Sequence, residues 1–190
     1  MRFATLFIIL SFLFACSSNE QKENALQQQY LQKGAQIAQL TQTELLKNVS
    51  QAMQKGGPVY AIEFCNLQAL VIKDSLSRAH DCQIQRLATK YRNPVDMPQS
   101  ETEKDQLSQY QQAFEKGQPL QPRVYAFDDH IEYYQPILLA KEACLKCHGA
   151  PGKDIAAETM TKIKERYPSD QATGFALNDF RGAWKITFNR

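Results

Sequence analysis

Two cysteines and a histidine in the last third of the chain are spaced for chemistry. Cys144, Cys147 and His148 form the pattern C-x-x-C-H, which is typical of covalent haem attachment. On a helix with about 100° per residue, positions i+3 and i+4 lie on either side of position i. The two thiols can then reach both vinyl groups of a porphyrin, while His148 reaches the iron. The motif therefore predicts one covalently bound haem c with His148 as an axial ligand of the iron.

The sequence leaves three other uses of this cysteine pair open. A thioredoxin-like redox pair would need a βαβ pattern around the motif, and none is evident. A zinc site would need further ligands, yet the chain has no second C-x-x-C and no H-x-x-x-H. A plain disulfide is the third alternative. An export signal favours haem among these readings, because c-type haem is attached on the exported side of the membrane.

The N-terminus has the features of such an export signal. Arg2 precedes an apolar run over residues 3–14, which is shorter than the ~20 residues of a membrane-spanning helix. The run ends in Leu-Phe-Ala-Cys at Cys16, which resembles the lipobox of bacterial lipoproteins. We therefore expect a lipoprotein signal peptide over residues 1–15 and a lipidated Cys16. An ordinary secretory signal with an incidental cysteine is the alternative.

These features predict the layout and the location of the mature protein. Residues 16–24 would form the lipidated N-terminus and a polar linker, and residues 25–190 are long enough for one domain with a single core. We expect a protein on the periplasmic side that is tethered to a membrane by its lipid. In a host with two membranes, Ser17 after the lipidated cysteine favours the outer membrane. The 22 basic and 20 acidic residues form no basic stripe, so no nucleic-acid partner is expected.

The pattern of apolar residues predicts an α+β fold. The expected helices cover residues 24–54, 59–79, 101–116, the region of Cys144 and 155–166. The expected strands cover residues 82–91, 123–127, 131–139 and 183–188, with the second and third forming a hairpin. Gly56-Gly57-Pro58 separates the first two helices. Helices followed by antiparallel strands favour a small antiparallel sheet that is backed by the N-terminal helices.

Spacing alone does not choose the ligand on the other face of the iron. The position is either open or taken by one of six side chains, namely Cys65, His80, His130, Met53, Met97 and Met160. A Met or His ligand is typical of electron-transfer cytochromes, whereas an open position binds small gases or peroxide. Cys65 could also be a small buried apolar residue or form a disulfide with Cys82. For His80 and His130, ordinary surface or turn histidines are the favoured alternative.

Several segments around the motif resemble a bacterial family of single-haem c-type proteins of the cyanobacterial Tll type. The segments before the motif are YAIEFC at residues 60–65, RLATKYRNP at 86–94 and YYQPI at 133–137. Those after the motif are ATGF at residues 172–175 and DFRGAWKIT at 179–187. The resemblance extends from about residue 52 to the C-terminus. C-x-x-C-H alone is generic, whereas its combination with Ala-Ile-x-x-Cys and Arg-Asn-Pro is specific.

The resemblance implies a PAS-like sensor fold and an unusual pair of axial ligands, which are His148 and Cys65 in this chain. A thiolate ligand donates charge to ferric iron and should lower the reduction potential. Arg86, Lys90 and Arg92 are candidate contacts of the haem propionates through charge-assisted hydrogen bonds, with solvated strand residues as the alternative. The chain departs from many family members by having Leu-Ala instead of Thr-Ser at residues 87–88.

Together these observations predict an exported, lipid-anchored haem protein that senses redox state or a small haem ligand and is not an enzyme. A periplasmic electron-transfer cytochrome c is the alternative. A haem peroxidase would need an open iron face with a distal His and Arg, and no such pairing is visible. The chain has no kinase, cyclase or DNA-binding segment, so a sensor would need a separate redox or signalling protein as its partner.

Overall fold

The computed structural model describes the backbone of residues 4–190 and the side chains from residue 20 onward. Arg2 and the side chain of Cys16, which carry the predictions of a signal peptide and of lipidation, lie outside the described residues. The expected linker at residues 16–24 is helical and continuous with the helix that follows it. Within the part of the chain that is described, no helix has both the length and the apolar character needed to cross a bilayer.

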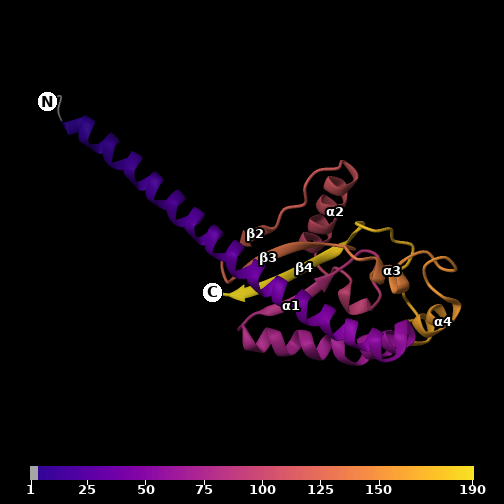
Figure 1. The fold of residues 1–190 in the computed structure, drawn as a ribbon. Coiled ribbons are helices and arrows are strands. Elements are labelled where there is room, and N and C mark those ends of the chain that lie inside the picture. Colours follow the sequence, from indigo (N-terminus) through magenta and orange to yellow (C-terminus); the bar gives the residue numbers. More distant parts are fainter. Residues whose placement is uncertain (1–3) are drawn as a thin grey trace.

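The helix α1 (Ala4–Ala79) consists of two helical segments that are joined at a pair of glycines. Gly57 has a φ of 67°, a left-handed conformation that favours glycine, and Pro58 fits the first turn of the second segment. The chain reverses there (Figure 1). As a result, Leu31 from the first segment and Leu76 from the second pack against the same core. The two predicted N-terminal helices are confirmed, and the first begins earlier than expected.

Four antiparallel strands form one sheet in the order β1-β4-β3-β2. They are β1 (Gln83–Leu87), β2 (Arg123–Ala126), β3 (His130–Leu138) and β4 (Phe180–Asn189). The predicted hairpin of β2 and β3 is confirmed. The last strand lies between β1 and β3 rather than at an edge, so its two faces are almost wholly buried.

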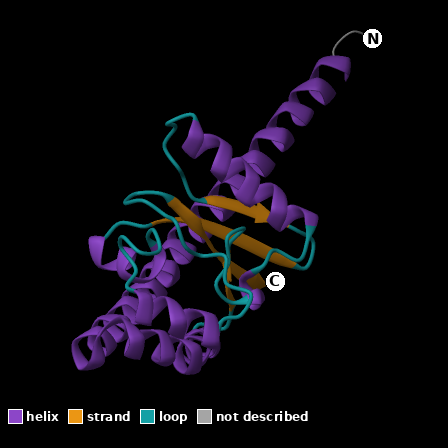
Figure 2. Ribbon diagram, turned by 90° about the vertical axis from the view of Figure 1, so that its right-hand side faces the viewer, coloured by secondary structure: helices purple, strands orange, loops and turns teal. Residues whose placement is uncertain are grey.

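Helices cover both faces of this sheet (Figure 2). On one face, Tyr133, Trp184 and Ile186 pack against Ile37 and other residues of α1. On the other face, side chains of the sheet pack against α2 (Glu101–Glu115), whose Ser100 and Glu103 form a capping box. The α+β prediction, with an antiparallel sheet backed by N-terminal helices, is confirmed.

The functional motif lies in the segment that connects β3 to β4. This segment contains α3 (Glu142–His148) and α4 (Ala157–Arg166), and the short 3-10 helix η1 (Pro94–Asp96) follows β1. Ile155 and Ile163 pack against Ile62 of α1, so the segment docks on the second half of α1. This docking brings residues from α1, the loop after β1 and the β3–β4 segment to one end of the sheet.

Candidate functional site

The helix α3 presents the two motif cysteines to different apolar clusters. Cys144 packs against Leu139, Ala172 and Phe175, whereas Cys147 packs against the cluster that joins α4 to α1. The end of α3 is fixed by the carbonyl oxygens of His148 and Gly149, which accept hydrogen bonds from the backbone of residues 174–175. Cys144 and Cys147 are half-buried, and neither forms a disulfide with another described cysteine.

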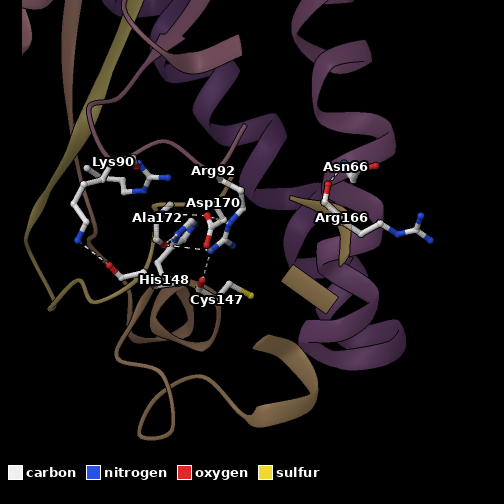
Figure 3. A network of polar contacts seen from close by, with 10 residues as sticks. Asn66, Lys90, Arg92, Cys147, His148, Arg166, Asp170 and Ala172 are labelled. Atoms are coloured by element: carbon white, nitrogen blue, oxygen red, sulfur yellow. Dashed lines mark hydrogen bonds and ion pairs between the residues drawn. The ribbon is translucent and has the colours of Figure 1, made fainter. Parts of the chain in front are cut away.

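His148 is held in the tautomer that can bind a metal ion. Its Nδ1 lies 2.8 Å from the carbonyl oxygen of Ala172 (Figure 3). Because a carbonyl oxygen only accepts, Nδ1 must donate, and the neutral ring then keeps a free lone pair on Nε2. Burial and the nearby Arg92 and Arg181 guanidiniums lower the pKa of His148 well below its ordinary value. The ring is therefore neutral at physiological pH, which is the form that ligates iron.

Cys65 reaches the same region from the second segment of α1. Burial raises the pKa of the Cys65 thiol to about 11, with a further contribution from Cys147, while Arg92 and Arg86 act in the opposite direction. Cys65 on α1 therefore lies within electrostatic range of Cys147 on α3. Without a cation to bind it, Cys65 is a neutral thiol at pH 7.

The stretch of α1 around Cys65 is attached to α4 by polar contacts. Asn66 Nδ2 donates to the carbonyl oxygen of Arg166 over 3.3 Å (Figure 3). The Arg166 guanidinium also forms an ion pair with Glu63. These contacts fix the α1 turn that carries Cys65 relative to the segment that carries His148.

Arg92 connects the loop after β1 to the backbone around the motif. Its Nε donates to Asp170 Oδ1 over 2.9 Å, and its Nη2 donates to the carbonyl oxygens of Cys147 (2.6 Å) and Ala172 (3.2 Å). The side chain is only 8% exposed. Arg92 thus positions both the motif and the carbonyl that orients His148. Arg92 donates most of its side-chain hydrogen bonds within the protein. Its contact with a haem propionate stays a prediction.

Lys90 lies at the outer edge of the site. Its Nζ donates to the carbonyl oxygen of Thr173 over 2.8 Å and lies 4.3 Å from the centroid of the Phe175 ring. That ring meets the imidazole of His148 edge-on, with 6.4 Å between the ring centroids. Lys90 and Arg181 line the same small cavity of about 190 Å³. A cation is thus available beside the histidine at a solvent-accessible edge.

Arg181 is a functional candidate that sequence reasoning missed. It was noted only as part of a family-like segment, whereas in the structure it is 5% exposed and close enough to His148 to lower its pKa. Its Nη1 donates to the carbonyl oxygen of Lys90 over 2.9 Å. A basic residue in a buried strand is the signal that identifies it, and β4 carries a second such residue at Lys185.

Most alternative ligands lie elsewhere. His130 is engaged with Asp129 over 2.6 Å at the start of β3, and Met97 is exposed. Cys82 is a free thiol that packs against the α1-covered core and not against Cys65. Met160 is different, because it packs into the same cluster as Cys147. Among the side chains that are described, no group of three or more His, Cys, Asp and Glu residues forms a metal cluster.

The fold and this arrangement of residues define an α+β protein in which a C-x-x-C-H helix meets a cysteine-bearing helix at one end of an antiparallel sheet. The sequence model of the Tll0287-like family matches residues 19–189, so the chain belongs to the Tll0287-like family. The resemblance that the sequence segments indicated is therefore confirmed.

A solved structure supports the same fold. The crystal structure of the cyanobacterial heme-protein Tll0287 matches with a TM-score of 0.65, over 85% of this chain and 96% of that chain. The two sequences are 24% identical, so this match speaks for the fold alone. The α+β architecture is consistent with a PAS-like fold. No functionally curated protein matches the chain.

Proposed function

We propose that this chain is a c-type haem protein in which Cys144 and Cys147 hold one haem and in which His148 and Cys65 bind its iron. The observation that carries the proposal is the hydrogen bond from His148 Nδ1 to Ala172, which leaves Nε2 free beside two unpaired cysteines. Each thiol would add across one vinyl double bond, with sulfur and hydrogen going to its two carbons. This addition needs no oxidant. The bound haem would supply redox chemistry and a site for small ligands.

The residues present fit such a group. A haem is apolar over most of its surface and has two carboxylates, and the motif is flanked by both apolar clusters and buried guanidiniums. Two of those guanidiniums, on Arg86 and Arg181, have a buried Nε without a hydrogen-bond partner. Arg86 is accordingly proposed as a contact of a propionate. Lys90 lies at the outer edge of the site, where its Nζ already donates to Thr173, and Arg92 acts mainly through the backbone of the motif.

The direct test is to ask whether haem is covalently attached. We expect full-length protein, produced with a c-type haem maturation system, to keep its haem on a denaturing gel stained for haem. Replacement of both motif cysteines (Cys144→Ala, Cys147→Ala) should abolish the stained band. Cys82→Ala is the matched control and should keep it, because Cys82 packs into a different core cluster. A wild-type protein that releases all its haem on acid extraction would refute covalent attachment.

We propose further that the protein works as a redox or small-ligand sensor. A thiolate fits ferric iron better than ferrous iron, and the buried position of Cys65 favours the neutral thiol when the iron charge falls. Reduction would then release Cys65 and open a coordination position for a small molecule. Any output would pass through a separate protein partner, and no catalytic role is proposed.

A periplasmic electron-transfer cytochrome is the second candidate, and one contact favours it. Met160 packs against the same apolar cluster as Cys147, so the segment that carries the motif also offers a Met ligand, which suits both oxidation states. Absorption spectra during a redox titration distinguish the two functions. A ligand change on reduction supports the sensor, whereas identical axial ligands in both states, lost in Met160→Ala, support the electron carrier.

Export and lipid anchoring on the periplasmic side are proposed from residues 1–16 alone. Labelled palmitate should be incorporated into the wild-type protein and not into Cys16→Ala, because only the lipobox cysteine is modified in such signals. The variant should also leave the membrane fraction. Equal labelling of both proteins would contradict the assignment of Cys16 as the lipidated residue.

A further inference from the structure

Two arginines in the site, the half-buried Arg86 and the buried Arg181, have hydrogen-bonding capacity that the protein does not use. The Nε atoms of Arg86 on β1 and Arg181 on β4 are buried and have no partner among the described residues. Neither guanidinium forms an ion pair within the described part of the chain, unlike Arg92, which pairs with Asp170 over 2.9 Å. Unpaired buried donors cost free energy, and a buried charge without a partner costs more.

The charges around these arginines do not balance. Arg181 is influenced by two like charges, Arg86 and Arg92, and by two carboxylates, Asp96 and Asp170. The three guanidiniums thus outnumber the two carboxylates, and Asp170 already forms an ion pair with Arg92. Arginine does not lose its proton near neutral pH, so the excess of positive charge cannot be relieved by titration. An anionic ligand would relieve it.

The position of the two arginines indicates which end of the site an anion would occupy. Arg181 lies against the face of Phe175, 5.1 Å from the ring centroid, and that ring meets the imidazole of His148 edge-on. Arg86 is close enough to Cys65 and Cys144 for their charges to affect its own pKa, which burial lowers. Arg181 therefore lies against the ring that contacts His148, and Arg86 lies within electrostatic range of Cys65. Guanidinium forks bind carboxylates in two parallel hydrogen bonds.

We propose that Arg86 and Arg181 together bind the propionate carboxylates of the haem and that Arg181 is an essential half of this clamp. The inference rests on the proposed function, because it requires a haem between His148 and Cys65. It assigns to Arg181 a role in positioning the haem and in setting its potential. The same clamp destabilises the haem-free protein, since it then keeps an uncompensated positive charge.

The clamp is tested by comparing Arg181→Met in the haem-free and the haem-loaded full chain. In the haem-free protein, the substitution should leave the urea midpoint of unfolding unchanged or raise it, because it removes an unpaired buried charge. In the haem-loaded protein, it should lower that midpoint, because a propionate then loses its partner. The midpoint reduction potential should also fall, since removing a nearby positive charge favours ferric iron. Arg181→Lys should restore part of the urea midpoint of the haem-loaded protein and part of the reduction potential.

Arg92→Met is the matched control, because Arg92 is paired within the protein and should stabilise it with or without haem. It should lower the urea midpoint of both forms. The clamp is refuted if Arg181→Met lowers the urea midpoint of the haem-free and the haem-loaded protein equally and leaves the reduction potential unchanged. A wild-type chain that binds no haem would instead refute the proposed function. The two failures are therefore distinguishable.

Discussion

At the scale of single residues, the site depends on a chain of contacts that starts at Arg92 and ends at the imidazole of His148. Arg92 holds the carbonyl groups of Cys147 and Ala172, and the Ala172 carbonyl fixes the imidazole tautomer. The free Nε2 of His148 is therefore a property of the folded protein and not of the motif alone. Proteins often orient metal-binding histidines by such a second hydrogen bond.

This role of Arg92 predicts a large effect of Arg92→Met on stability. The substitution leaves the Asp170 carboxylate, whose side chain is 4% exposed, without its partner. Breaking a buried pair in this way costs about 3–5 kcal/mol of unfolding free energy. Urea unfolding followed by circular dichroism measures it. Lys104→Met, which removes an exposed pair with Glu101, is the control and should cost at most about 1 kcal/mol. Equal losses in the two variants would contradict the account.

At the scale of elements, a buried ionic network attaches α2 to the sheet. Lys185 on β4 contacts Glu103 of α2 over 2.9 Å and Glu132 of β3 over 2.5 Å. Glu103 also accepts hydrogen bonds from the backbone of Gln99 and Ser100. The same carboxylate therefore caps the N-terminus of α2 and anchors this helix to the sheet. The network holds α2 over one face of the sheet, and Phe114 of the same helix lines the small cavity that Lys90 and Arg181 border.

The network predicts a pH-dependent contribution of Glu103 to stability. Burial acts to raise the pKa of Glu103, but hydrogen bonds from Lys185, Gln99 and Ser100 lower it below its ordinary value. A carboxyl group whose pKa is lower in the folded state stabilises the protein above its unfolded pKa and loses this effect in acid. The difference in unfolding free energy between wild type and Glu103→Gln should therefore shrink below about pH 4.3.

The control for this titration is Glu115→Gln, an exposed position on the same helix. Its difference from wild type should stay small between about pH 3 and pH 7, because exposed charges contribute little. A Glu103→Gln difference that stays constant or grows on acidification would show that the carboxylate does not stabilise the fold in this way.

A second prediction at this scale concerns the contact of α1 with the sheet. A methyl group on Gly34 would collide with the ring of Tyr133, which lies directly beneath it. Alanine normally favours a helix interior over glycine by about 1 kcal/mol, but overpacking a core costs about 1–3 kcal/mol. Gly34→Ala should therefore lower the melting temperature. Ser50→Ala, at an exposed position of the same helix, should not, and a stabilised Gly34→Ala would disprove the close contact.

At the scale of the whole molecule, local patterns predicted the elements, the hairpin and the helical cover of the sheet, but not the order of all four strands. Helix and strand positions follow from periodicity, and the glycine pair at residues 56–57 marks the boundary between the two helical segments of α1. The central place of β4 depends on long-range pairing, which leaves no local signal. The motif at residues 144–148 could be identified from spacing. That Cys65 lies near this motif was implied only by the family resemblance. The role of Arg181 needed the structure, because its neighbours come from distant segments.

The central claim is that Cys65 of α1 and His148 of α3 bind the same iron. The most direct measurement is low-temperature EPR of the oxidised haem-loaded protein, comparing wild type with Cys65→Ser and with Cys82→Ser as the control. We predict a low-spin ferric signal of thiolate type in wild type and Cys82→Ser, and its loss in Cys65→Ser. An unchanged signal in Cys65→Ser would remove Cys65 from the iron and contradict the account.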